Sequence, residues 1–170
     1  DAVKELAVNF GQTLNTYDCF LLERGMKTLA LRMARHNENA MAVAKHLSKC
    51  PGISNLRYPG LKSDDGHRIS VRQMRNGFGG MLAFDVGRTQ DDAKRFISAL
   101  KTIRHAVSLG STESLICVPF LTTMLYMPPE RRTSFGVRPN SVRLSVGVEP
   151  IGDLLADLDQ ALRPAKRRRR

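Results

Sequence analysis

Arg143 carries a side chain that could bind a carboxylate. It lies in the segment 142–148, where apolar residues alternate with Arg143, Ser145 and Gly147, a pattern typical of a strand with one buried face. A guanidinium is a planar fork of donors that matches a carboxylate, and a strand would hold it rigidly. The alternation alone favours a simpler interpretation, an arginine that faces solvent, because basic residues are mostly exposed.

Small polar and acidic side chains gather between two apolar runs, in the segment 108–114. Gly110 and the residues after it interrupt the apolar pattern, and loops of this composition often carry function. The loop between the two apolar runs is therefore a candidate for function. Glu113 and Ser114 could also belong to an ordinary loop or helix cap, and Ser108 could be a small residue that ends a strand.

The cysteines and histidines do not predict a metal site. Cys19, Cys50 and Cys117 are odd in number, widely spaced and form no C-x-x-C pair, which indicates a reducing compartment. Two of the four histidines, His36 and His46, share a helical stretch but are ten residues apart, a poor spacing for one metal ion.

A long helix is predicted ahead of these segments, over about residues 17–49. Asn15 and Thr16 are suitable N-caps, and apolar residues then recur at three-four spacing. Gly25 weakens the helix by roughly 1 kcal/mol relative to alanine, so a bend or break is expected near it. The segment 50–52, Cys-Pro-Gly, ends the helix.

Strands and shorter helices follow each other along the rest of the chain. Strands are predicted over residues 53–58, 81–86, 104–109, 115–118 and 142–148, and helices around 69–74, from a capping box at 89–92 to about 101, after Pro129 and after Pro150. Such a mixture predicts an α/β (α+β) two-layer fold, a sheet with helices packed on one side.

The composition is that of an ordinary globular domain. The chain has 170 residues, of which 42% are hydrophobic, enough for a real core without disulfides. Its net charge is +11, with 27 Lys and Arg against 16 Asp and Glu, and the basic segment 163–170 carries six of the positive charges. This tail is predicted to be disordered and solvated, although a nucleic-acid contact is the alternative. No apolar run approaches the ~20 residues of a membrane helix.

Five motifs together resemble one enzyme family. They are LLERGMKTL at 21–29, YPGL at 58–61, GFGGM at 77–81, SLG at 108–110 with ESL at 113–115, and VRLSVGVE at 142–149. Their order and spacing resemble the carboxy-terminal domain of the Cys/Met-metabolism pyridoxal-phosphate enzymes, over about residues 11–162. The family includes cystathionine γ-synthase, the cystathionine lyases and methionine γ-lyase. The resemblance implies a fold-type I transferase domain, with a small, mostly antiparallel sheet and a long bent amino-terminal helix.

The resemblance also implies a cofactor, pyridoxal 5'-phosphate, that this chain does not hold covalently. The family's cofactor lysine lies in an amino-terminal domain within a Ser-x-Thr-Lys-aromatic motif, and none of the eight lysines here follows a threonine. Because the cofactor acts as the electron sink, a domain without that lysine can orient a substrate but cannot convert it.

The family's functional residues match four positions here. Arg143 resembles the arginine that binds the substrate α-carboxylate, and Ser114 resembles a serine that helps hold the cofactor lysine and that carboxylate. Glu113 resembles the acid that influences which sulfur substrate is accepted, and Ser108 lies close to the substrate.

The sequence departs from the family pattern near the substrate. Ser111 stands where relatives often have a glycine, and Thr122-Thr123-Met124 replaces a common Met-Thr-His. These differences leave the identity of the sulfur substrate open. The pair Glu113-Ser114 favours the cystathionine-handling members.

Two functions remain as hypotheses. The first is a substrate-orienting domain, residues 1–162, of a cytoplasmic transsulfuration enzyme that forms or cleaves a C–S bond. Its partners would be a sulfur amino acid, an amino-terminal cofactor domain and further copies in a homo-oligomer. The second is an inactive binding module that holds an acidic partner through its basic surface and Arg-rich tail.

Overall fold

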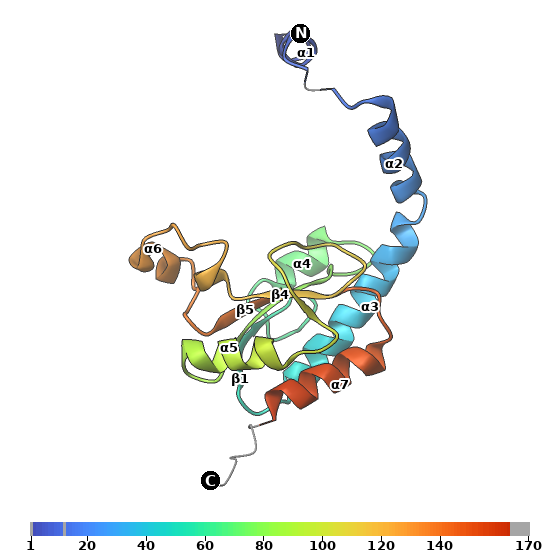
Figure 1. The fold of residues 1–170 in the computed structure, drawn as a ribbon. Helices are drawn as coiled ribbons and strands as arrows, with labels where there is room; N and C mark the ends of the chain where they lie inside the picture. Colours follow the sequence, from blue (N-terminus) through green and yellow to red (C-terminus); the bar gives the residue numbers. More distant parts are fainter. Residues whose placement is uncertain (1, 12, 164–170) are drawn as a thin grey trace. The chain divides into compact units, whose positions relative to one another are not determined.

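The computed structural model describes residues 2–11 and 13–163 (Figure 1). They form seven α-helices, five strands and one 3-10 turn. The predicted basic tail lies outside the described residues, apart from Arg163. The chain divides into two compact units, Asp1–Arg32 and Met33–Arg170. No helix in the described part combines the length and apolar character that crossing a membrane requires.

The first unit contains α1 (Ala2–Asn9), α2 (Thr16–Met26) and the start of α3 (Leu29–Leu47). Asn15 caps α2 as predicted, because its side chain accepts a hydrogen bond from the Asp18 N–H at 2.9 Å. The predicted helix over 17–49 forms as two helices, and the break after Met26 falls close to the bend expected at Gly25. There Arg32 donates to the Gly25 carbonyl at 2.7 Å, which pairs one of the carbonyls at the end of α2.

The second unit is built on a five-stranded sheet with the order β1-β2-β5-β4-β3. The strands are β1 (Ile53–Arg57), β2 (Met81–Val86), β3 (Arg104–His105), β4 (Leu115–Cys117) and β5 (Ser141–Ser145). The pairing of β3 with β4 is parallel and the other three pairings are antiparallel. The expected small, mostly antiparallel sheet is confirmed.

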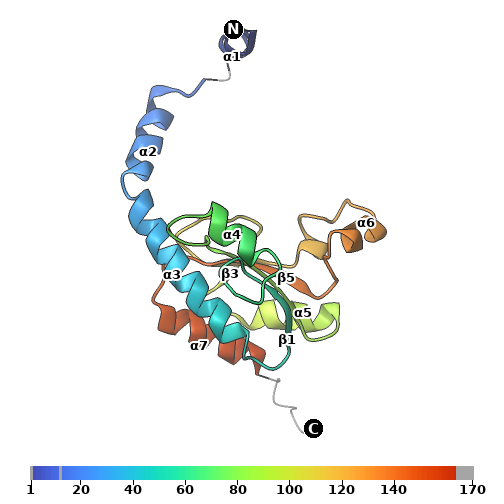
Figure 2. The ribbon, with the colours of Figure 1, turned by 180° about the vertical axis from the view of Figure 1, so that it is seen from behind.

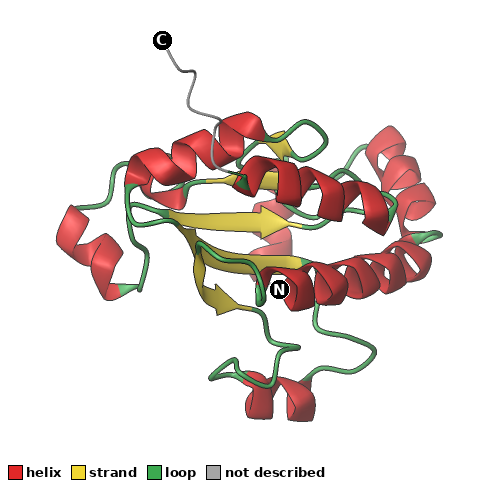
Figure 3. Cartoon of the chain, turned by 90° about the horizontal axis from the view of Figure 1, so that it is seen from below, coloured by secondary structure: helices red, strands yellow, loops and turns green. Residues whose placement is uncertain are grey.

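Three helices cover one face of this sheet, α3, α5 (Gln90–Ala99) and α7 (Ile151–Leu162), as Figures 1 and 2 show. Figure 3 shows the strands and helices seen from below. Their apolar residues form one core with the inward residues of the strands. The largest fully buried apolar side chains include Tyr58, Phe84, Leu47, Leu82, Leu144, Leu154 and Leu158. Burying each contributes roughly 1.5–3 kcal/mol, so these contacts hold the helices to this face of the sheet.

Two short helices and a turn complete the second unit. They are α4 (His67–Gln73), α6 (Pro129–Ser134) and the 3-10 turn η1 (Pro119–Leu121). The Tyr58 hydroxyl donates to the Gly79 carbonyl at 3.0 Å, and burial raises the pKa of Tyr58 to about 12. His67 donates to the Pro59 carbonyl at 2.7 Å, and its ring packs against the ring of Phe78. These contacts hold the segments around residues 58–60 and 77–80 together.

The predicted strand over residues 104–109 is the clearest error. Only Arg104 and His105 lie in β3, and the Ala106 N–H adds one bond to the Ile116 carbonyl at 3.1 Å. The chain then leaves the sheet, and the loop that follows bonds to Arg143 and Ser145 on the sheet face opposite the three helices. Gly110 in this loop has φ +76°, a conformation that favours glycine. The strand predicted over 142–148 likewise ends at Ser145, although the Val146 N–H still bonds the Gly80 carbonyl.

Candidate functional site

Arg143 lies in the middle of β5, on the sheet face opposite the three covering helices. Its neighbours across the sheet are Ala83 on β2 and Cys117 on β4. Val142 and Leu144, which flank it, are fully buried in the core. The strand alternation therefore places Arg143 on the open face, as predicted, with its backbone held between two paired strands.

The guanidinium of Arg143 contacts the segment that follows β3. Its Nη2 donates to the Val107 carbonyl and, at 3.3 Å, to the Ser108 carbonyl. A guanidinium has five N–H donors, and among the described residues no contact uses Nη1 or Nε. The loop carbonyls therefore orient one edge of the Arg143 guanidinium and leave its Nη1 and Nε donors available for a ligand.

The strand that carries Arg143 also positions Ser108. The Gly110 N–H donates to the Ser145 hydroxyl at 3.0 Å, and Ser145 lies two residues after Arg143 on the same face. The loop 107–110 is thus attached to β5 at both ends, at Arg143 and at Ser145. Ser108 is exposed beside the Arg143 guanidinium, so the structure brings these two predicted site residues together.

Glu113 lies on the exposed surface of the following loop. Its carboxylate accepts hydrogen bonds from the Ser111 hydroxyl and, at 3.3 Å, from the Thr112 hydroxyl. The Ser111 hydrogen bond is the main cause that holds the pKa of Glu113 below its ordinary value. At neutral pH the loop therefore presents a carboxylate.

Ser114 is buried in a small hydrogen-bond network and does not line the cavity that contains Arg143. Its hydroxyl donates to Glu149 at 2.9 Å and accepts from the Gly147 N–H at 2.8 Å. The Ser114 N–H also donates to Glu149, at 2.5 Å. These bonds fasten the 112–114 loop to the chain after β5, and the role that the resemblance gives Ser114 stays a prediction.

Gly147 is required for this close approach. A Cβ atom at this position would lie 2.3 Å from the Thr112 carbonyl oxygen, closer than atoms can pack. On the other side, Asn39 of α3 donates to the Gly147 and Glu149 carbonyls at 3.1 and 2.9 Å, and His36 donates to the Val146 carbonyl at 2.6 Å. No local sequence pattern indicates these roles of His36, Asn39 and Glu149.

Replacing Ser114 with alanine is expected to lower the free energy of unfolding by about 1–3 kcal/mol, because it leaves a half-buried carboxylate oxygen of Glu149 and the buried Gly147 N–H without their partner. Urea unfolding of the 170-residue chain measures this. The control is Ser111→Ala, which removes a hydroxyl bonded to an exposed carboxylate and should change stability by less than about 0.5 kcal/mol. Equal midpoints for wild type and Ser114→Ala would contradict a structural role.

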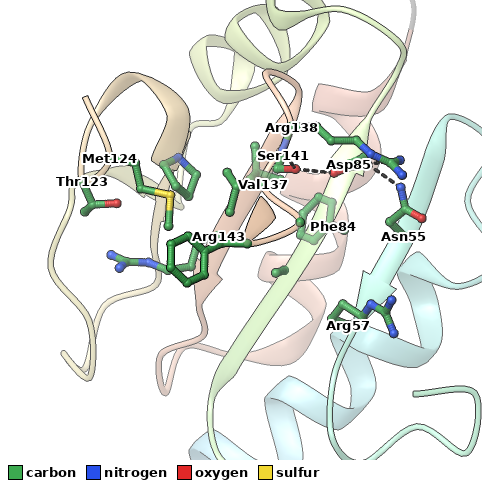
Figure 4. A pocket seen from close by; sticks show the side chains of 15 residues that line it. Asn55, Arg57, Phe84, Asp85, Thr123, Met124, Val137, Arg138, Ser141 and Arg143 are labelled. Atoms are coloured by element: carbon green, nitrogen blue, oxygen red, sulfur yellow. Dashed lines mark hydrogen bonds and ion pairs between the residues drawn. The ribbon is translucent and has the colours of Figure 1, made fainter. Parts of the chain in front are cut away.

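A cavity of about 480 Å³ opens beside Arg143 (Figure 4). Its walls come from β1, β2, β5, the loop after η1 and the segment after α6. Thr123 and Met124, from the segment 122–124 that differs from the common Met-Thr-His, line it. Figure 4 shows Arg143 on the side of Thr123 and Met124, and Arg138, Asp85 and Asn55 on the opposite side. One of the departing residues, Met124, therefore lies in the same cavity as the predicted carboxylate-binding arginine.

Three arginines line the cavity, and they differ in whether an acidic side chain pairs with them. Arg138 forms an ion pair with the buried Asp85 at 3.0 Å, and Asp85 also accepts from Ser141. Arg57 forms an ion pair with Asp65. Of the three cavity arginines, Arg143 is the one without an acidic partner among the residues that the structure describes. An arginine with free donors at a cavity favours an anionic ligand.

Among the residues that the structure describes, no lysine lines this cavity. Together with the missing Ser-x-Thr-Lys-aromatic motif, this means that the residues present do not supply covalent attachment for pyridoxal phosphate.

The family model of the Cys/Met metabolism PLP-dependent enzymes matches residues 1–163. The chain therefore belongs to this family of pyridoxal-phosphate-dependent enzymes. Cystathionine gamma-lyase of Dictyostelium discoideum is 43% identical to it over 160 residues, 94% of this chain and 41% of that protein. Cystathionine beta-lyase of Lactococcus lactis subsp. cremoris (strain MG1363) is 44% identical over 155 residues, 91% of this chain and 40% of that protein.

A solved structure has the same fold. Cystathionine gamma-lyase from Lactobacillus plantarum, complexed with L-serine, superposes with a TM-score of 0.83 and 39% identity. The match covers 90% of this chain and 40% of that one. The fold-type I assignment is confirmed, and the chain spans about two fifths of the length of these relatives.

Proposed function

We propose that this chain is the substrate-orienting part of a transsulfuration enzyme that forms or cleaves the C–S bond of cystathionine or a related sulfur amino acid. The observation that carries the proposal is Arg143, an arginine with free donors and no acidic partner among the described residues, at the edge of a cavity. The relatives are lyases of this substrate class by name.

In this proposal Arg143 binds the substrate α-carboxylate through the donors that the loop 107–110 leaves available. Ser108 lies beside the guanidinium and adds a hydroxyl near the carboxylate. Because β5 is paired on both sides, the fork is held in place before the substrate arrives, which lowers the entropic cost of binding. Pyridoxal phosphate, bound elsewhere in the intact enzyme, supplies the electron sink for the C–S chemistry.

Glu113, Thr123 and Met124 are proposed to select the sulfur substrate. Glu113 is ionised at neutral pH and would attract the distal ammonium group of cystathionine. Ser114 is proposed to act on the substrate site through the 112–114 loop that it fastens. An amino-acid ligand is consistent with the L-serine bound in the Lactobacillus plantarum relative.

We also infer the partners of the intact enzyme. An amino-terminal domain would supply the cofactor lysine, and the enzyme would act as a homo-oligomer in the cytoplasm. The coverage of the relatives supports the first inference, because the chain matches about two fifths of their length.

A chimeric enzyme tests the proposal. This chain replaces the segment that it matches in the Dictyostelium discoideum cystathionine gamma-lyase, and cystathionine turnover is measured with added pyridoxal phosphate. We expect the chimera to be active, and a cystathionine analogue with an amide in place of the α-carboxylate to be turned over much more slowly. A folded, cofactor-loaded chimera without turnover of any sulfur amino acid would favour the inactive binding module.

The 170-residue chain alone is expected to show neither C–S lyase activity nor the visible absorption of a lysine-linked cofactor. Surface lysines bind the cofactor without orientation, so they do not provide catalysis. Spectra and cystathionine turnover, measured with and without added pyridoxal phosphate, check this. Measured turnover by the purified chain would contradict the assignment of the cofactor lysine to another segment.

A further inference from the structure

A second group of chemistry-bearing side chains lies away from the Arg143 cavity, where the end of α3 meets α7. His46 belongs to the last turn of α3, Cys50 follows it, and Asp159 lies on α7. One ligand atom from each of the three lies within 4.8 Å of the other two. The His46 ring Nε2 is 2.6 Å from Asp159 Oδ1. None of the three lines the cavity beside Arg143.

The packing of the two helices brings these residues together. Leu47 and Leu158, which are their sequence neighbours, are at most 1% exposed and belong to the same core, so α3 and α7 are fixed relative to each other at this point. Cys50 lies in the turn that follows α3, where its thiol donates to the His46 carbonyl at 3.4 Å. The arrangement is therefore set by the core before any ligand binds.

Imidazole, thiolate and carboxylate are the three protein ligand types that Zn²⁺ prefers. Tetrahedral bonds of about 2.0–2.3 Å separate the ligand atoms by roughly 3.3–3.8 Å, so small side-chain rotations from the observed positions are sufficient. The thiolate disfavours Mg²⁺ and Ca²⁺, which select oxygen ligands. The side chains of His46 and Asp159 are 29% and 47% exposed, which leaves access for the ion and a water as fourth ligand.

We propose that His46, Cys50 and Asp159 form a binding site for a thiophilic divalent cation of the Zn²⁺ type. The bound ion cross-links the end of α3 to α7, two helices that cover the same face of the sheet. The site is independent of the function proposed above.

Metal titration of the 170-residue chain, purified after treatment with a chelator, tests this proposal. Co²⁺ serves as the spectroscopic probe and Zn²⁺ as its competitor. We expect one Co²⁺ per chain, with the visible absorption of a tetrahedral ion and a near-ultraviolet thiolate-to-cobalt band. Zn²⁺ should displace the Co²⁺ and raise the Tm, because an ion that binds only the folded state stabilises it.

Cys50→Ser should abolish the thiolate band, and His46→Ala and Asp159→Asn should each weaken Zn²⁺ binding by at least about tenfold, the effect of 1.4 kcal/mol. Circular dichroism confirms that each variant is folded. Cys19→Ser and His105→Ala remove an exposed cysteine and an exposed histidine elsewhere and should leave binding unchanged. Absence of stoichiometric binding by the wild type, binding retained in Cys50→Ser, or binding lost in Cys19→Ser would each overturn the proposal.

Discussion

Replacing Arg143 with alanine in the chimeric enzyme is expected to lower kcat/KM by a factor of about ten to more than one hundred. The change removes a charge-assisted hydrogen-bonded pair with the substrate α-carboxylate, which contributes about 1.5–3 kcal/mol or more to binding. Each 1.4 kcal/mol corresponds to about a tenfold change. Steady-state kinetics with cystathionine measure the effect.

Arg143→Lys should recover only part of the loss, because an ammonium group is a point charge and cannot reproduce the planar fork. The domain should remain folded in both variants, since the guanidinium lies on the open face and the core contacts of Val142 and Leu144 are unchanged.

Arg57→Ala is the matched control. Arg57 lines the same cavity but already pairs with Asp65, so its removal should change kcat/KM by much less. An unchanged kcat/KM in Arg143→Ala, or an equal loss in Arg57→Ala, would show that Arg143 does not bind the carboxylate. Arg143 would then be a solvent-facing arginine with no binding role, the interpretation that its strand pattern alone favours.

Elements with a local signal could be predicted from the sequence. The strand β2 shows strict alternation over 81–86, and its bounds match the structure. The capping box at the start of α5 also forms as predicted, since Thr89 and Asp92 cap each other within four residues of chain. Both signals are contained in a short segment, so no distant partner is needed to interpret them.

Elements that depend on distant contacts could not be predicted in the same way. Apolar composition alone extends the strand that starts at Arg104 to residue 109. The chain turns away after Ala106 because the loop bonds to Arg143 and Ser145, more than thirty residues later. A pattern within one segment carries no information about such partners.

The residues of the candidate site show the same difference between local and distant determinants. Arg143 lies on the predicted face because strand alternation is local. The burial of Ser114 depends on Glu149, which is 35 residues away, and the bonds of His36 and Asn39 join positions about 110 residues apart. The cluster of His46, Cys50 and Asp159 escapes a search by spacing for the same reason, since His46 and Asp159 are 113 residues apart.

Replacing Asp157 with asparagine is expected to lower the free energy of unfolding at neutral pH by about 3 kcal/mol, because three backbone donors lose a charged acceptor. The Asp157 carboxylate, on the buried side of α7, accepts from the N–H groups of Lys101, Thr102 and Ile103, each at 2.9 Å. Asp157 is 4% exposed, so water cannot replace these bonds. An asparagine keeps the size but offers one acceptor oxygen and turns an NH₂ group toward the donors.

The loss should depend on pH. Burial alone would raise the pKa of Asp157, but hydrogen bonds from Ile103, Lys101, Thr102 and Gln160 outweigh it and hold the pKa below its ordinary value. Because the pKa is lower in the folded than in the unfolded chain, the ionised carboxylate stabilises the fold. This contribution is complete above the unfolded value of about 4 and is lost as the pH falls through the folded pKa.

Urea unfolding of the wild type and Asp157→Asn between about pH 7 and pH 3 measures this linkage. The difference in stability should be largest at neutral pH and shrink below about pH 4. Asp92, whose pKa also lies below its ordinary value, titrates in both proteins and cancels in the difference. The control is Asp153→Asn, an exposed acid in the first turn of the same helix, which should cost less than about 1 kcal/mol. A difference between wild type and Asp157→Asn that stays constant down to acidic pH would show that the buried charge does not hold the 101–103 segment.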